Sequence, residues 1–159
     1  MNTQTVIEGV TPPPAPKRTD AMVKAAVLAY IGRHGFEWCD GDVDQAAADI
    51  ASEYHDGMDG YQLAKTLEAD CYWGELGLQD AEDLDGISSA VHDAEEAARK
   101  AWAAEWNIQP ALPIGAQIKQ GVIAGVYEYG AACYKVKAHG CTQDGRLIVK
   151  FEDAQGVAK

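Results

Sequence analysis

The stretch WNIQPALPIGAQIKQGVIAGVYEY, residues 106–129, marks the point where the pattern of the chain changes. Before it, apolar residues recur every three or four positions, which is the spacing of an amphipathic helix. After Pro110, apolar and polar residues alternate with a period of two, which is typical of strands with one buried face. Pro110 also disfavours helical geometry at the residue before it, so the last helix has to end near Asn107. The change predicts an α+β protein, helical before residue 110 and β-rich after it.

Four helices are expected before this point, packed as an N-terminal helical bundle over residues 20–109. Their expected ranges are 21–33, 43–54, 60–70 and a long helix from residue 80 or 81 to 106. Aspartates are expected at three N-caps, where a carboxylate accepts an unpaired backbone N–H: Asp20, Asp42 or Asp40, and Asp59. Gly86 lies inside the long helix, where glycine costs about 1 kcal/mol relative to alanine. Tyr61, Tyr72 and Trp73 are expected to pack inward.

The β part is expected over residues 110–159 as a small antiparallel SH3-like barrel. Three segments have strand patterns: residues 117–129, 132–138 and 146–154. Asp144-Gly145 is a hairpin turn signal, and Gly121 and Gly125 suit bends or bulges in curved strands. Within residues 132–138, Tyr134 and Val136 are predicted to face opposite to Cys133, Lys135 and Lys137.

Residues 1–19 are expected to form a flexible arm, because prolines at positions 12, 13, 14 and 16 favour extended geometry. These residues lack the basic stretch followed by an apolar stretch that is typical of a secretion signal. No apolar run approaches the roughly 20 residues needed to cross a bilayer. We therefore expect no membrane association and a cytoplasmic location.

The charge of the chain is unevenly distributed. The 159 residues include 25 acidic and 13 basic ones, a net charge of −12. Residues 36–96 contain 18 acids and a single base, Lys65, whereas residues 112–159 contain six bases and four acids. An acidic surface repels nucleic acid and attracts basic proteins. The alternative interpretation is that the acids serve solubility alone.

Two groups of acidic residues are the candidate partner-binding site. They are Asp40, Asp42, Asp44 and Asp49 in the first group, and Asp80, Glu82, Asp83 and Asp85 in the second. Helix capping accounts for only one or two carboxylates at each helix start, so the remainder suggests a phosphate-like surface. The first group has the opening spacing of an EF-hand, but Gln45 and Ala51 occupy the positions that need glycine and glutamate. A calcium loop is therefore excluded.

No metal, cofactor or catalytic centre is predicted. Cys133, His139 and Cys141 are the best candidates for zinc, but a fourth ligand is missing and zinc sites normally have four. The serines and histidines are scattered and match no nucleophile motif. No phosphate-binding glycine loop precedes a helix. An enzymatic function is therefore disfavoured, although pairs of carboxylates among the 25 acidic residues leave a hydrolase open.

Binding of nucleic acid by the β part is the alternative function. Basic grooves with stacking aromatic residues hold single strands in small barrels. The candidates are Lys119, Lys135, Lys137 and Lys150, near Tyr127, Tyr129 and Tyr134. The net charge of about +2 in residues 112–159 is weak for this task.

Three segments resemble small uncharacterised acidic proteins of tailed phages and prophages. These segments are GYQLAKTLEADCYW, WNIQPALPIGAQIKQGVIAGVYEY and YKVKAHGC with GRLIVKFEDA, within residues 57–155. The resemblance implies a phage or prophage origin and transfers no activity or functional residue. Small acidic phage proteins often disable host systems, CRISPR interference complexes among them. The expected function is therefore a non-catalytic, anti-CRISPR-like inhibitor or adaptor that binds a basic host protein or nucleoprotein complex. Acidic DNA mimicry is one route to such binding.

Overall fold

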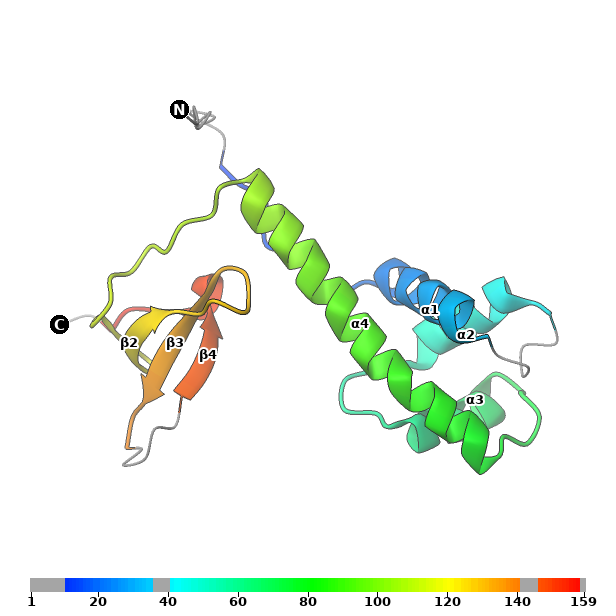
Figure 1. The fold of residues 1–159 in the computed structure, drawn as a ribbon. Helices are drawn as coiled ribbons and strands as arrows, with labels where there is room; N and C mark the ends of the chain where they lie inside the picture. Colours follow the sequence, from blue (N-terminus) through cyan, green and yellow to red (C-terminus); the bar gives the residue numbers. More distant parts are fainter. Residues whose placement is uncertain (1–10, 36–40, 141–145, 158–159) are drawn as a thin grey trace. The chain divides into compact units, whose positions relative to one another are not determined.

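The computed structural model describes residues 11–35, 41–140 and 146–157, and in these it has an α+β architecture (Figure 1). Four helices come first: α1 (Asp20–His34), α2 (Val43–Glu53), α3 (Gly60–Asp70) and α4 (Leu78–Glu105). Four strands follow: β1 (Gln117–Ile118), β2 (Gly121–Val126), β3 (Cys133–Ala138) and β4 (Arg146–Lys150). A short 3-10 helix, η2 (Phe151–Asp153), follows β4. The predicted order of helices and strands is confirmed.

The chain divides into two compact units, which we describe separately. The helical unit is residues 17–95, and the sheet unit is residues 96–159 together with the segment before residue 17. The division falls inside α4, whereas the sequence pattern placed the boundary between residues 109 and 110. The helical unit contains 18 acidic and five basic residues, a net charge of −13 that leaves the sheet unit with +1.

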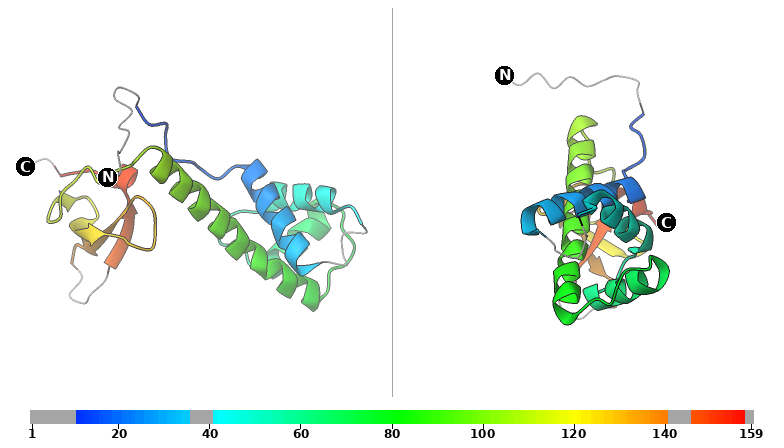
Figure 2. Two further views of the ribbon diagram at one scale, coloured as in Figure 1. Left: turned by 45° about the horizontal axis from the view of Figure 1, so that its top comes forward. Right: turned by 90° about the vertical axis from the view of Figure 1, so that its right-hand side faces the viewer.

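The core of the helical unit is formed by apolar stripes from all four helices. Both views in Figure 2 show α1, α2 and α3 gathered around the first half of α4. Their largest fully buried side chains are Val27, Ile50, Leu63, Leu67, Leu84, Ile87 and Val91. The predicted caps at Asp42 and Asp59 are confirmed, since their carboxylates accept the N–H groups of Gln45 and Gln62. Thr19, not Asp20, caps α1.

Two tyrosines that were expected inside lie on the surface. The buried stripe of α3 runs through Gly60, Leu63, Ala64 and Leu67, so Tyr61 lies one position off the stripe and is 61% exposed. Tyr72 is 91% exposed and has a positive φ of 58°. The left-handed backbone at Tyr72 follows the end of α3, where such a residue commonly reverses the chain.

Gly86 is required by packing rather than being a weak point of α4. A Cβ atom at this position would come within 1.8 Å of the Tyr30 hydroxyl oxygen. Tyr30 lies across α4 here and donates its O–H to the carbonyl of Asp83 at 2.9 Å. The helix-propensity cost of glycine is therefore offset by a partly buried aromatic contact between α1 and α4.

The sheet unit contains an antiparallel sheet with the strand order β1-β2-β3-β4. Its core consists of Ile118, Ile123, Tyr134, Val136 and Val149. The expected alternation in β3 holds from Tyr134 onward, because Tyr134 and Val136 are buried at 1% and 0% exposure and Lys137 is exposed. Cys133, expected on the opposite face from Tyr134, is also buried at 6% exposure. A register shift between Ile123 and Gly125 makes an irregularity in β2, which is where a glycine bulge was predicted.

The sheet is open among the described residues, so the predicted closed SH3-like barrel is not confirmed. The segment after η2 returns to the first strand through an isolated antiparallel bridge between Ile118 and Gly156. Gly121 allows β2 to approach β3 closely, since a Cβ there would lie 2.0 Å from the carbonyl oxygen of Lys137. The predicted Asp144-Gly145 turn lies outside the described residues.

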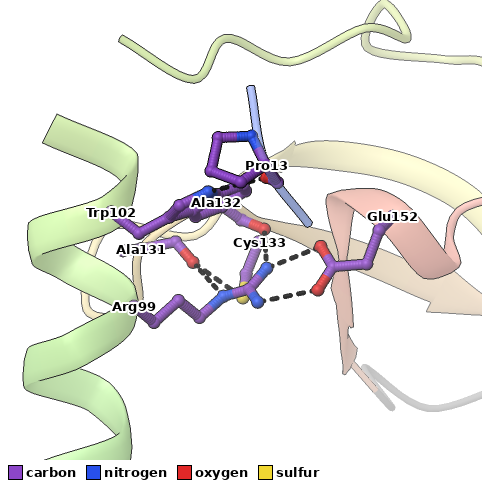
Figure 3. A network of polar contacts seen from close by, with 7 residues as sticks. All are labelled: Pro13, Arg99, Trp102, Ala131, Ala132, Cys133 and Glu152. Carbon is purple, nitrogen blue, oxygen red and sulfur yellow. Dashed lines mark hydrogen bonds and ion pairs between the residues drawn. The ribbon is translucent and has the colours of Figure 1, made fainter. Parts of the chain in front are cut away.

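A buried arginine fixes the last part of α4 to the sheet within the sheet unit (Figure 3). Arg99 is only 4% exposed. It donates to the carbonyls of Ala131 and Ala132 at 2.8 and 3.1 Å, and to both carboxylate oxygens of Glu152 at 2.7 Å. Close by, the Trp102 indole donates to the carbonyl of Pro13 at 3.0 Å. Pro13 of the predicted arm therefore contacts α4.

None of the helices in the described part of the chain combines the length and the apolar character needed to cross a membrane.

Candidate functional site

Acidic residues from both predicted groups meet at one cleft of the helical unit. The cleft has a volume of about 420 Å³. Asp42, Gln45 and Asp49 line it from α2, and Asp80 lines it from the first turn of α4. The connection between α3 and α4, residues 72–76, closes the remaining side. No basic residue is among the described residues that line this cleft.

Neutral hydrogen-bond donors hold the carboxylates of the cleft in place. Asp49 accepts from the indole N–H of Trp73 at 2.9 Å and from the Gln45 side chain at 2.7 Å. Asp42 accepts the backbone N–H of Gln45 at 3.0 Å. Asp80 accepts the backbone N–H of Gly77 at 2.7 Å, just before α4. These neutral partners do not neutralise the acids, so the cleft keeps its negative charge.

The aromatic part of the cleft was missed by sequence reasoning. Trp73 packs against the core as predicted and also lines the cleft, whereas Tyr72 was expected inside and lines the cleft as an exposed residue. Glu75 adds a carboxylate from the same connection. Aromatic faces and carboxylates together are the groups that bind the side chains of arginine and lysine. The only sequence signal was the close spacing of Tyr72, Trp73 and Glu75 in a short connection.

The other predicted acids lie away from the lining of the cleft. Asp44 forms an ion pair with Lys24 at 2.9 Å. Asp83 accepts from the Gln79 side chain at 3.1 Å, and Asp85 accepts the backbone N–H of Gly60. Glu82 is exposed and forms no hydrogen bond or ion pair with the described residues. Asp40 lies outside the described residues.

These positions correct one step of the sequence argument. Capping was expected to account for one or two carboxylates at each helix start, with the rest left to repel one another. In the structure, Asp49 and Asp85 also bind donors from other elements, and Asp44 pairs with a lysine. The surplus of acids without an internal role is therefore smaller than the sequence suggested, and it is concentrated at the cleft and at Glu82.

The candidate zinc ligands do not come together. Cys133 begins β3 and His139 follows its end, so their backbones lie about 20 Å apart at 3.3 Å per residue. Cys141 lies outside the described residues. Within the described ranges, no group of three or more His, Cys, Asp or Glu residues is arranged to hold a metal ion.

We expect a chelator to leave the melting temperature unchanged. A structural metal contributes directly to folding free energy, so its removal lowers the stability strongly. Thermal unfolding with and without EDTA measures this. A large drop in melting temperature with EDTA would contradict the prediction.

Cys71 and Cys133, the two cysteines within the described residues, are not activated as nucleophiles. Burial raises the pKa of the Cys71 thiol, and the nearby Asp49 carboxylate raises it further. Burial also raises the pKa of Cys133, although the Arg99 guanidinium opposes this effect. Because the thiolate is the reactive form, both groups are protonated and weakly reactive at neutral pH.

The residues of the alternative nucleic-acid site divide into two sets. Tyr134 belongs to the core, and its hydroxyl accepts the backbone N–H of Leu112 at 2.9 Å. Lys119 lies at the turn before β2 and donates to the Gln155 side chain. In contrast, Lys135, Lys137 and Lys150 lie at alternate positions of β3 and β4.

Comparison of the chain with protein-family models, with curated proteins and with solved structures gives no match. The resemblance to small acidic phage proteins therefore stays a prediction.

Proposed function

We propose that the protein is a non-catalytic inhibitor or adaptor that binds a basic, nucleic-acid-handling protein through its acidic helical unit. The observation that carries this proposal is the acidic cleft. Asp42, Asp49, Glu75 and Asp80 line it beside Tyr72 and Trp73. The charge of −13 on the surrounding unit supports the same function.

The cleft suits the insertion of an arginine or lysine side chain from the partner. Its carboxylates accept charge-assisted hydrogen bonds, and Trp73 offers an aromatic surface beside them. The surrounding negative charge attracts a basic partner from a distance and speeds association. A partner whose basic surface is occupied in this way can no longer hold nucleic acid there.

The phage resemblance suggests where such a partner is found. It would be a host protein or nucleoprotein complex in the cytoplasm, and a CRISPR interference complex is one example. The sheet unit would serve as a second small domain of SH3-like type. The bridge between Ile118 and Gly156, with η2 directly after β4, supports this finer classification.

The first test removes two charges from the cleft while leaving the helix caps intact. Asparagine caps a helix about as well as aspartate, so Asp42→Asn with Glu75→Gln changes charge and little else. The partner is isolated from host lysate with the wild-type chain and identified by mass. We expect the double variant to lose at least about tenfold in affinity for it, because charged hydrogen bonds contribute about 1.5–3 kcal/mol each.

The matched control is Asp70→Asn with Asp93→Asn, which removes the same charge from exposed positions outside the cleft. Its association should slow only through long-range attraction, and the difference from wild type should disappear as salt shortens the Debye length. A third variant, Glu82→Gln with Asp83→Asn, asks whether acids of α4 outside the cleft contribute. Equal affinities for the cleft variant and the control would refute the cleft as the binding site. Association rates that do not change with salt would refute the acidic mechanism.

A further inference from the structure

The outer face of the sheet carries four cations. In β3, Tyr134 and Val136 face the core, so Lys135 and Lys137 point to the other side. The register places Arg146 of β4 directly opposite Lys137, and Ile148 opposite Lys135. Lys150 has the same outward parity, opposite Cys133. The acidic chain therefore has a concentrated basic face in its sheet unit.

This arrangement has an electrostatic cost that the described residues compensate only in part, through Glu128 beside Lys135 and Glu152 in the field of Lys150. Like charges directly opposite each other on neighbouring strands are destabilising, and Lys137 and Arg146 are such a pair. Lys135 has a carboxylate nearby, that of Glu128 at 3.8 Å, but Glu128 is largely exposed. Within the described ranges, Lys137, Arg146 and Lys150 form no ion pair. An anionic ligand would remove this repulsion.

A groove lies along the basic face. It has a volume of about 430 Å³ and is lined by Lys135, Lys137 and Arg146 on one side and by residues 124–126 and Glu128 on the other. Gly125 is paired with Lys135, and a Cβ added to Gly125 would meet nothing within 4 Å. The missing side chain therefore leaves the floor of the groove open, and neither strain nor packing requires a glycine there.

Exposed aromatic and apolar groups accompany these cations. Tyr129 follows Glu128, which lines the groove, and it lines a second pocket that shares Glu128 and includes Lys100. Its ring is 83% exposed and packs edge-on against Tyr127 at 5.7 Å. Ile148 is 47% exposed beside Lys135. Cationic grooves with an exposed ring beside them hold single strands, because the cations follow the phosphates and the ring stacks on a base.

We propose that this basic face binds the backbone of a single-stranded nucleic acid. A phosphodiester chain supplies closely spaced negative charges that match cations on adjacent strands, and Tyr129 supplies the stacking surface. The site is separate from the acidic cleft, and its test needs no partner protein.

The test uses the full chain and a fluorescein-labelled 20-nucleotide oligo-dT in anisotropy titrations at several salt concentrations. Each phosphate neutralised on a single strand contributes about −0.7 to the slope of log K against log salt. Engagement of all four cations would therefore give a slope of about −2.8, and Lys137→Gln with Arg146→Gln should reduce it by about 1.4. The same double variant should melt at a temperature no lower than the wild type, because it removes the like-charge pair.

The matched control, Lys17→Gln with Arg33→Gln, removes two positive charges from exposed positions outside the groove and should bind nearly as the wild type does. Gly125→Phe should block the groove and abolish binding without loss of the fold, because its Cβ has open space. The proposal is overturned by no binding at 50 mM salt, by equal binding of the two charge variants, or by unchanged binding of Gly125→Phe. It is also overturned if the basic face serves only to associate with the acidic unit of a second copy. That result would appear as salt-sensitive self-association in light scattering, without oligo-dT binding.

Discussion

Replacing Gly60 with alanine is expected to destabilise the helical unit by about 3 kcal/mol or more. A Cβ at Gly60 would lie 2.0 Å from the carbonyl oxygen of Ala81 and 2.5 Å from the backbone nitrogen of Asp85. Both atoms belong to the backbone of α4, so no side-chain rotation relieves the clash. Overpacking commonly costs 1–3 kcal/mol, and here two helices have to separate. The hydrogen bond from the Gly60 N–H to Asp85 would be lost with them.

Urea unfolding followed by circular dichroism measures this change. Gly32→Ala is the matched control, because Gly32 lies within α1 and a Cβ there would meet nothing within 4 Å. Alanine at this position should stabilise the unit by up to about 1 kcal/mol through helix propensity. If the two variants change stability in the same direction, the close approach of α3 to α4 at Gly60 is wrong.

The helix boundaries could be predicted from the sequence because local interactions determine them. Asp42 and Asp59 cap the helices that follow them, as their carboxylate chemistry predicts. The change of period at Pro110 separates the last helix from the strands, which also depends only on neighbouring residues. Gly60 and Gly86 could not be interpreted in this way, because the atoms that exclude a Cβ come from other helices. Local propensity alone made Gly86 look unfavourable.

The candidate sites depended more on tertiary structure. The sequence identified acids at the starts of two helices, but only the fold places Asp49 and Asp80 on one cleft with Trp73. On the sheet, alternation predicted that Lys135 and Lys137 share a face. Arg146 was not among the candidate nucleic-acid-binding residues, because its position opposite Lys137 depends on the strand register.

Replacing Arg99 with methionine is expected to lower the stability of the sheet unit by about 2–3 kcal/mol. Methionine retains much of the apolar stem but donates no hydrogen bond. The carbonyls of Ala131 and Ala132 and the Glu152 carboxylate would all lose their donor (Figure 3). Removing one partner from a buried charged network costs more than the network contributes to stability, because the remaining polar groups stay desolvated. The expected loss is smaller than for a fully buried ion pair, because Glu152 is partly exposed.

The measurement is urea unfolding with hydrogen exchange of peptides that cover β3 and β4, which locates the loss in the sheet unit. Arg18→Met is the matched control, because Arg18 also pairs with a carboxylate, but Asp56 is 80% exposed. Exposed pairs contribute little, so this variant should change stability far less. Equal losses for Arg18→Met and Arg99→Met would show that burial of the Arg99 network is unimportant.

The pH dependence of unfolding provides a second readout of the same network. The Arg99 guanidinium holds the pKa of the Glu152 carboxyl below its ordinary value of 4.5. A carboxyl whose pKa is lowered by folding stabilises the protein above its unfolded pKa, and this contribution is lost as the pH falls through the lowered folded pKa. The wild-type sheet unit should therefore lose stability from about pH 4.5 downward, and Arg99→Met should lose less over the same range. Glu152→Gln should also flatten the acid dependence, because it removes the titrating group while the arginine remains. If the three proteins share one acid profile, the ion pair between Arg99 and Glu152 does not contribute to the stability of the sheet unit.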